Sequence, residues 1–322
     1  MQVRRSFAAA LAVGSLLLVA GCAGNDLSKS GSDKASSSPS ASTGTAGDKG
    51  TVHIASQNFP EAAIVTSMYD QLLTKAGYTT DVKLVDARDA YMGTFPKTID
   101  VVPEYVGGIV NFLNTAKNGD NAKPLTSGNG QELAAAGKSL LDAAGITLLD
   151  QSQATDTNAF FVTKDFSQAE HATKLSDLEG QQVVLAAAPD CKDRLDCEGG
   201  LTDQYGIDVT EVLPLGYAVD ATYQSVLDNE SQLGETSTTD GTLDSQGLVV
   251  LEDDKHIQPA QNLVPAVSKT FLADHPDVEK TLDDLMAALT TQKLTELNGK
   301  VAVDRQQPDA VAKEFLTQEG LL

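Results

Sequence analysis

The sequence IDVVPEYVGG, residues Ile99–Gly108, is the stretch that decides the fold. Its β-branched residues at 99–102 predict a short buried strand of a parallel sheet. Pro103 ends that strand, because proline has no N–H to donate to a sheet. Glu104 and Tyr105 follow at once, and in open α/β sheets ligands bind beyond the carboxyl ends of the strands. Tyr105 is therefore a candidate ligand contact, although both side chains could instead simply end the strand and cover its tip.

Strands and helices alternate on both sides of this stretch, which predicts a parallel sheet with right-handed crossovers. The expected elements before it are a strand at 52–54, a helix from Pro60 that ends at Gly77, a strand at 82–84 and a short helix over 90–97. After it we expect a helix over 131–143 and a strand over 146–149. The chain thus begins with one α/β unit.

A second α/β unit follows, because the chain leaves the first one through the polar segment 150–156. Its expected strands lie at 158–163, 182–187, 209–215 and 247–251. A further strand at 263–267 and helices over 276–289, 291–297 and 308–316 close the chain. We divide the chain into lobe 1, residues 51–152 and 258–322, and lobe 2, residues 153–257.

Composition excludes some partners. The chain has 322 residues, a formal net charge of −22, no Trp and seven Tyr. Nothing in it forms a basic patch for phosphates, so nucleic acid is not an expected partner. A strongly acidic protein instead attracts cations towards any cleft.

The first 22 residues resemble the signal of a bacterial lipoprotein. Arg4 and Arg5 precede a 14-residue apolar run, and small residues stand just before Cys22. The run is too short for a permanent membrane span. We expect cleavage and lipidation at Cys22, which would anchor the protein to a membrane face. The alternative is an ordinary signal peptide with an incidental cysteine.

Residues 23–50 are small and polar and predict a disordered tether.

Cys191 and Cys197 are the remaining cysteines. An exported chain enters a compartment in which disulfides persist, so we expect a bond between them that stiffens the enclosed loop. No histidine stands near enough in the sequence to make a zinc site with them.

Motifs for catalysis are not found in the sequence, which contains no G-x-S-x-G, no H-E-x-x-H and no P-loop. We expect no enzyme activity, no cofactor and no metal. Asp253, Asp254 and His256 could form a metal cluster, but an acidic turn where the chain crosses between lobes is the more ordinary interpretation.

Binding is the better-supported class of function, because several polar turns follow predicted strands. In a two-lobed α/β protein such turns face one another across a cleft. Asp240 could alternatively cap a turn with Gly241. The candidate residues in these turns are Gln57, Asn58, Glu104, Tyr105, Arg194, Thr239 and Asp240.

Seven segments in order resemble the osmoprotectant-binding lipoproteins of ABC importers, which take glycine betaine, choline, carnitine or proline betaine. They are the lipobox, SQNFPEAAIV, PEYVGG, LSDLEG, TTDGTL, LEDDKHIQPAQNLVP and the ending from LTELNG to Leu322. The resemblance covers residues 51–322. It implies a type II periplasmic-binding-protein fold, with two α/β lobes, two crossing hinge segments and a ligand cleft between the lobes.

The resemblance also implies roles for particular residues. Relatives hold the quaternary ammonium in a cage of tyrosines by cation–π attraction. Tyr105 matches one of these tyrosines, and Phe160 falls near another. Gln57 stands at a turn where relatives place a ligand-binding Lys or Gln. Arg194 matches an arginine that meets the ligand's carboxylate.

Several positions depart from the family pattern, and at least two cage tyrosines are missing. Tyr91, Tyr217 and Tyr223 are the candidates to replace them. The departures are Pro60 for a threonine, EYVGG for E-Y-T-G-T, Ser237–Asp240 for Y-S-T-D, and Gln261 for the tyrosine of P-Y-N.

These inferences predict a monomeric, lipid-anchored solute-binding protein on the extracytoplasmic face of the cell membrane. Its partners would be a quaternary-ammonium solute and an ABC permease with its ATPase. Two alternatives remain: the same fold with another small polar or cationic solute, and a lipid-anchored enzyme or cell-wall module.

Overall fold

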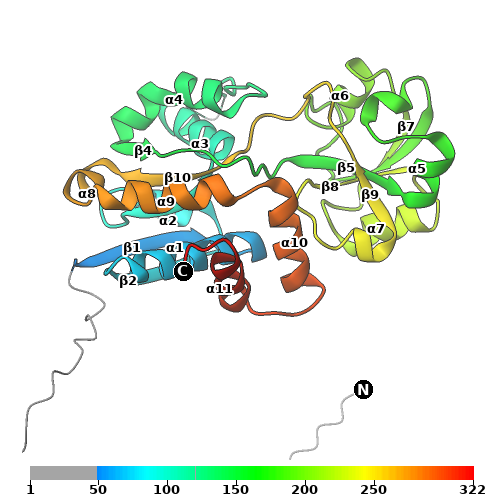
Figure 1. Cartoon of the computed structure of the whole chain (residues 1–322). Coiled ribbons are helices and arrows are strands. Elements are labelled where there is room, and N and C mark those ends of the chain that lie inside the picture. Colours follow the sequence, from blue (N-terminus) through cyan, green and yellow to red (C-terminus); the bar gives the residue numbers. More distant parts are fainter. Residues whose placement is uncertain (1–48, 120) are drawn as a thin grey trace, which may run out of the picture. The chain divides into compact units, whose positions relative to one another are not determined.

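The computed structural model describes residues 49–119 and 121–322 (Figure 1). The predicted signal peptide, the lipidated Cys22 and nearly all of the predicted tether lie outside the described residues. None of the helices in the described ranges is long and apolar enough to cross a membrane.

The first sheet has five strands in the order β2-β1-β3-β10-β4. β1 runs parallel to β2 and β3, whereas β10 is antiparallel to both of its neighbours. The sheet is therefore mixed, and the parallel arrangement predicted from the sequence holds for its first three strands only. The strands are β1 (Thr51–Gln57), β2 (Thr79–Val85), β3 (Val101–Tyr105), β4 (Ile146–Leu148) and β10 (Leu263–Ser268).

Helix α1 (Pro60–Lys75) covers one face of this sheet and packs against β1, β2 and the C-terminal helices α9, α10 and α11. Pro60 opens the helix, where its missing N–H costs nothing. Ile64, Val65 and Met68 are fully buried, which is the apolar face that the spacing predicts. The C-terminal helices are α8 (Lys269–Asp274), α9 (Asp277–Ala288), α10 (Thr291–Ala302) and α11 (Pro308–Gln318).

Three helices pack within a second apolar cluster of the same lobe: α2 (Arg88–Met92), α3 (Val106–Asn118) and α4 (Gly130–Ala144). Gly137 of α4 meets Val110 of α3 so closely that a Cβ at 137 would overlap the valine methyl groups. The predicted helix over 90–97 is corrected to Arg88–Met92, with Gly93 as its C-cap.

The second sheet has the order β7-β6-β8-β5-β9. β6 is parallel to β7 and β8, and β5 is antiparallel to β8 and β9. Its strands are β5 (Asn158–Thr163), β6 (Gln182–Ala186), β7 (Asp208–Leu213), β8 (Leu233–Ser237) and β9 (Leu248–Leu251). Its helices are α5 (Lys164–Glu170), α6 (Glu198–Asp203), α7 (Asp220–Leu227) and the 3₁₀ turns Leu175–Leu178 and Asp244–Gln246.

Two segments connect the sheets, residues 149–157 and 252–262, and they run antiparallel where they meet. Thr155 forms an isolated bridge with Asn262, and the Asp156 N–H donates to the Gln261 carbonyl at 3.2 Å. The boundaries that we drew at 152/153 and 257/258 lie within these segments and stay a prediction.

Helix α10 also touches the second lobe. The Asn298 amide donates to the Thr239 carbonyl at 2.9 Å, and a Cβ at Gly241 would overlap the backbone of Thr295 and Gly299. Glycine at 241 is what allows this close backbone approach.

Candidate functional site

A cavity of about 460 Å³ lies where α1, α10, the first connecting segment and lobe 2 meet. Lobe 1 contributes the start of α1 and one face of α10, and lobe 2 contributes β8 and the turns beside it. Its lining residues are Phe59, Pro60, Glu61, Asp156, Tyr217, Ala218, Tyr223, Ser237, Thr239, Asp240, Gly241, Thr242, Asn298 and Ala302. Both lobes thus form the walls, as expected of a ligand cleft.

Two of the three carboxylates in this cavity are held by hydrogen bonds from the protein. Glu61 is 3 % exposed and accepts from the Tyr105 hydroxyl and, at 2.7 Å, from the Asn298 amide. Asp240 accepts from the Tyr223 hydroxyl at 2.7 Å and from both the N–H and the hydroxyl of Thr242. These two carboxylates are well satisfied without a ligand.

Asp156 is different. Its Oδ1 is buried and has no hydrogen-bond partner among the described residues. Burial, and then the charge of Glu61, raise the pKa of Asp156 to about 7, although the hydroxyls of Thr239 and Ser237 act in the opposite direction. The same side chain also lines a smaller cavity of about 80 Å³ beside Asp196. Asp156 is therefore a half-buried residue whose buried Oδ1 has unused hydrogen-bonding capacity.

The tyrosines at the cavity stay neutral. Burial raises the pKa of Tyr217 and of Tyr223, and it also raises the pKa of Tyr105, whose hydroxyl faces Glu61. Tyr217 is 40 % exposed and lines the cavity. These rings offer π faces beside carboxylates, which is a favourable setting for an organic cation.

The structure thus brings together at the cavity four of the predicted ligand contacts: Tyr217, Tyr223, Thr239 and Asp240. Tyr105 reaches the same site through its bond to Glu61.

The other predicted contacts lie elsewhere. Gln57 ends β1 and Asn58 is an exposed residue of the turn that leads to the cavity. Tyr91 is buried with its hydroxyl on Glu104, and Phe160 packs within the core of lobe 2. Arg194 donates to both oxygens of Asp196 and to Asp190.

Ten of the fourteen lining residues were not predicted from the sequence, and they include Glu61, Asp156 and Asn298. In the sequence, Glu61 stands out only as part of the segment SQNFPEAAIV, and Asp156 only as part of a connecting segment. Their partners are far away in sequence, since Asn298 stands 237 residues from Glu61. No local pattern indicated this contact.

The loop that contains Arg194 is closed by a disulfide between Cys191 and Cys197, as predicted. Both cysteines are buried beside Glu235. Asp253 binds the backbone N–H groups of Ile257 and Gln258, so it supports a turn in this structure.

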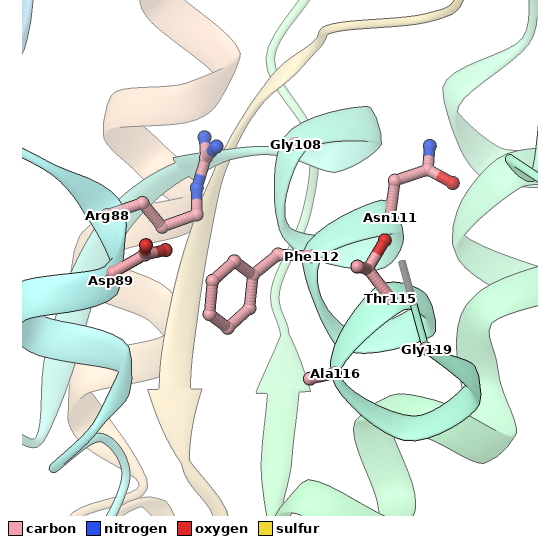
Figure 2. Close-up of a pocket in the computed structure, with 8 residues that line it drawn as sticks. All are labelled: Arg88, Asp89, Gly108, Asn111, Phe112, Thr115, Ala116 and Gly119. Atoms are coloured by element: carbon pink, nitrogen blue, oxygen red, sulfur yellow. The ribbon is translucent and has the colours of Figure 1, made fainter. Parts of the chain in front are cut away.

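A second cavity, of about 670 Å³, lies between α2 and α3 (Figure 2). Arg88 and Asp89 come from α2, and the remaining lining residues come from α3 and Gly119 after it. Arg88 donates to both oxygens of Glu104, at 2.8 and 3.0 Å. Lobe 1 alone forms this cavity, so we take the cavity shared by the two lobes as the candidate site.

Comparison with known proteins agrees with this geometry. Residues 50–318 match the model of the substrate-binding domain of ABC-type glycine betaine transport systems. The chain belongs to this family.

Members of this glycine betaine transport family include curated relatives that align along most of the chain. The glycine-betaine-binding protein of Pseudomonas aeruginosa is 28 % identical over 294 residues, covering 84 % of this chain and 89 % of the relative. The glycine betaine-binding protein YehZ of Escherichia coli is 25 % identical over 287 residues, covering 84 % of this chain and 90 % of the relative.

Solved structures support the fold. The unliganded YehZ structure from Escherichia coli has a TM-score of 0.72 at 24 % identity and covers 84 % of this chain and 99 % of its own. A glycine betaine/carnitine/choline ABC transporter structure has a TM-score of 0.73 at 20 % identity, covering 84 % and 98 %. The two-lobed periplasmic-binding-protein fold is confirmed. As a family member, the protein is an extracytoplasmic substrate-binding component that binds a small solute and interacts with the permease of an ABC importer.

Proposed function

We propose that the protein binds a quaternary-ammonium compatible solute, such as glycine betaine, choline or carnitine, in the cavity between its lobes. The observation that carries this proposal is the composition of the cavity wall. Tyrosine rings stand beside carboxylates there, and the two lobes supply the walls together. A methylated ammonium is attracted to the faces of aromatic rings and to negative charge. The ligands named for the relatives are of this kind.

Delivery would follow from closure of the lobes around the ligand. The two connecting segments, 149–157 and 252–262, are the natural hinge, because they alone join the sheets along the chain. A ligand that contacts both lobes stabilises the closed state, and the permease then meets a surface that exists only with ligand bound. The protein would thus act by binding rather than by catalysis.

The predicted anchor completes the proposal. Lipidation of Cys22 would hold a monomer at the extracytoplasmic face of the membrane. The segment 23–50 would give it reach, on the order of 90 Å if fully extended.

A second candidate is another small cationic solute in the same cavity. The observation that favours it is the modest aromatic wall, since Tyr217 and Tyr223 are the two tyrosines that line the cavity. A complete cage would need more rings around one nitrogen.

A thermal-shift panel tests the proposal. Glycine betaine, choline, carnitine, ectoine and neutral amino acids would be added at millimolar concentration to the mature protein. A ligand at 100 times its Kd stabilises the folded state by about 2.7 kcal/mol, so a bound quaternary amine must raise the Tm. Tyr217→Ala should reduce that rise in Tm. Another tyrosine such as Tyr78 is unsuitable for the control substitution, because Tyr78 is a core residue. The exposed Val303→Ala is the matched control. A shift by none of the quaternary amines would overturn the proposal.

A further inference from the structure

The charge of the cavity wall restricts which ligands fit. Three carboxylates line it, Glu61, Asp156 and Asp240, and its lining residues, all within the described part of the chain, include no Lys, Arg or His. Opposite charges a few ångströms apart attract strongly where protein displaces water, and like charges repel equally. A ligand that carries a carboxylate therefore meets three acids and no base.

The two arginines of neighbouring segments do not change this balance. Arg194 forms a two-nitrogen pair with Asp196, at 2.9 and 2.8 Å, and Arg88 forms a similar pair with Glu104. Such paired contacts use the planar donor face that would otherwise bind a ligand's carboxylate. In this structure both guanidinium groups are occupied by the protein's own acids.

The start of α1 is an unfavourable place for a carboxylate. Helix starts attract anions through their unbonded N–H groups. Here Pro60 has no N–H, and Glu61 places its own negative charge in the first turn. The negative charge of Glu61 would repel a ligand's carboxylate.

Asp156 is the acid with capacity left for a ligand. Glu61 and Asp240 accept hydrogen bonds from side chains around them, whereas Oδ1 of Asp156 is buried and unpartnered. An unpaired buried acceptor is costly, so it favours a ligand that brings a positive charge or a hydrogen-bond donor.

We propose that Asp156 is the counter-charge for the ligand's cationic group, and that the cavity binds cations without a carboxylate, such as choline, in preference to zwitterionic betaines. This inference rests on the proposed function and specifies its ligand class. The hydroxyl of choline adds a donor that glycine betaine lacks.

Proton release follows from this role. The titratable groups facing Asp156 are Glu61 of α1, Tyr105 after β3, Tyr217 of lobe 2 and Asp240 after β8. None of them supplies a positive charge, so without ligand burial keeps Asp156 protonated below about pH 7. A bound cation favours the ionised form, so binding must release a proton. Affinity for the cation should accordingly fall by at most about tenfold for each pH unit below 7.

Titration calorimetry with choline chloride and glycine betaine tests the inference. At pH 8 the wild-type protein should bind choline more tightly than glycine betaine. Asp156→Asn should lower the affinity for choline by about thirtyfold, which is the low end for removing one member of a desolvated charge pair. The affinity for glycine betaine should fall little or should rise. Asp283→Asn is the matched control, because burial also raises the pKa of Asp283 but this residue lies on α9 outside the cavity.

Measurements on the wild-type protein keep the inference testable if the variant does not fold. Choline titrations at pH 7 in buffers of different ionisation enthalpy should report release of part of a proton. Three results would overturn the inference and leave the proposed function intact. They are tighter binding of glycine betaine than of choline, an equal loss of affinity for both ligands in Asp156→Asn, and no proton release. Failure of both ligands to bind at millimolar concentration would overturn both.

Discussion

Replacing Tyr105 with phenylalanine removes one hydroxyl group that supports Glu61 behind the cavity wall. That hydroxyl donates to Glu61, whose side chain is almost fully buried. A hydrogen bond to a charged group contributes about 1.5–3 kcal/mol, and water has little access to replace it here. Asn298 would still hold the other oxygen of Glu61. We therefore expect Tyr105→Phe to lower the free energy of unfolding by about 1.5–3 kcal/mol, or the Tm by roughly 3–10 °C.

Urea denaturation of the mature protein measures this loss, and Tyr78→Phe is the matched control. The Tyr78 hydroxyl also donates to a carboxylate, that of Asp277 at 2.8 Å, but the Asp277 side chain is 44 % exposed. Water can replace that donor, so this variant should lose less than about 1 kcal/mol. Equal losses in the two variants would show that burial of Glu61 does not set the magnitude. The double variant Tyr105→Phe with Glu61→Gln should lose less than the sum of the two single changes, because both remove the same contact.

Three further outcomes are expected. Cys22→Ser should move the protein out of the membrane fraction or block its processing, and unchanged fractionation would contradict lipid anchoring. Mass spectrometry of the freshly secreted, non-reduced protein should find Cys191 joined to Cys197, whereas two free thiols would contradict the bond. Gly241→Ala should lower the free energy of unfolding by about 1–3 kcal/mol, because the added Cβ overlaps α10. Gly93→Ala is the control, since a Cβ there meets only ordinary contacts, and equal losses in the two variants would contradict a specific clash.

Local patterns were sufficient to predict most of the elements, because periodicity and breakers act over a few residues. The helix from Pro60 and the strand at 263–267 were predicted in this way, and the structure contains α1 and β10 there. The direction of β10 was not predictable, since nothing in its sequence specifies which strands it joins. Its antiparallel pairing with β3 and β4 is a property of the whole chain path.

The helix at 106–118 shows a second limit. No helix is among the elements expected from the sequence at these residues. VGGIVNF has two glycines near its start, and glycine weakens a helix. The structure nevertheless forms α3, and its glycines lie in close contacts: a Cβ at 107 would overlap the Ala260 carbonyl, and a Cβ at 108 would meet the Arg88 guanidinium. Tertiary packing overrides the local preference at these positions.

The site was predictable in part. The polar turn at 238–241 indicated Thr239 and Asp240, because residues beyond strand ends gather at one edge of a sheet. The strand before this turn, β8, was not among the predicted strands. Phe160 and Tyr91 point into packed interiors instead, and side-chain direction depends on neighbours that the sequence does not specify. The pairing of Glu61 with Asn298 joins residues from near both ends of the described chain.

The position of β10 in the middle of the first sheet has a consequence for biosynthesis. During translation, the strands β1, β2, β3 and β4 emerge long before Leu263, so lobe 1 cannot form its pairings with β10 until about the last fifth of the chain is available. The strands of lobe 2, in contrast, are contiguous and can pair earlier. Contacts between distant segments form slowly because long loops must close first. A nascent or truncated chain would therefore expose the apolar faces of lobe 1, which favours chaperone capture and slow collapse.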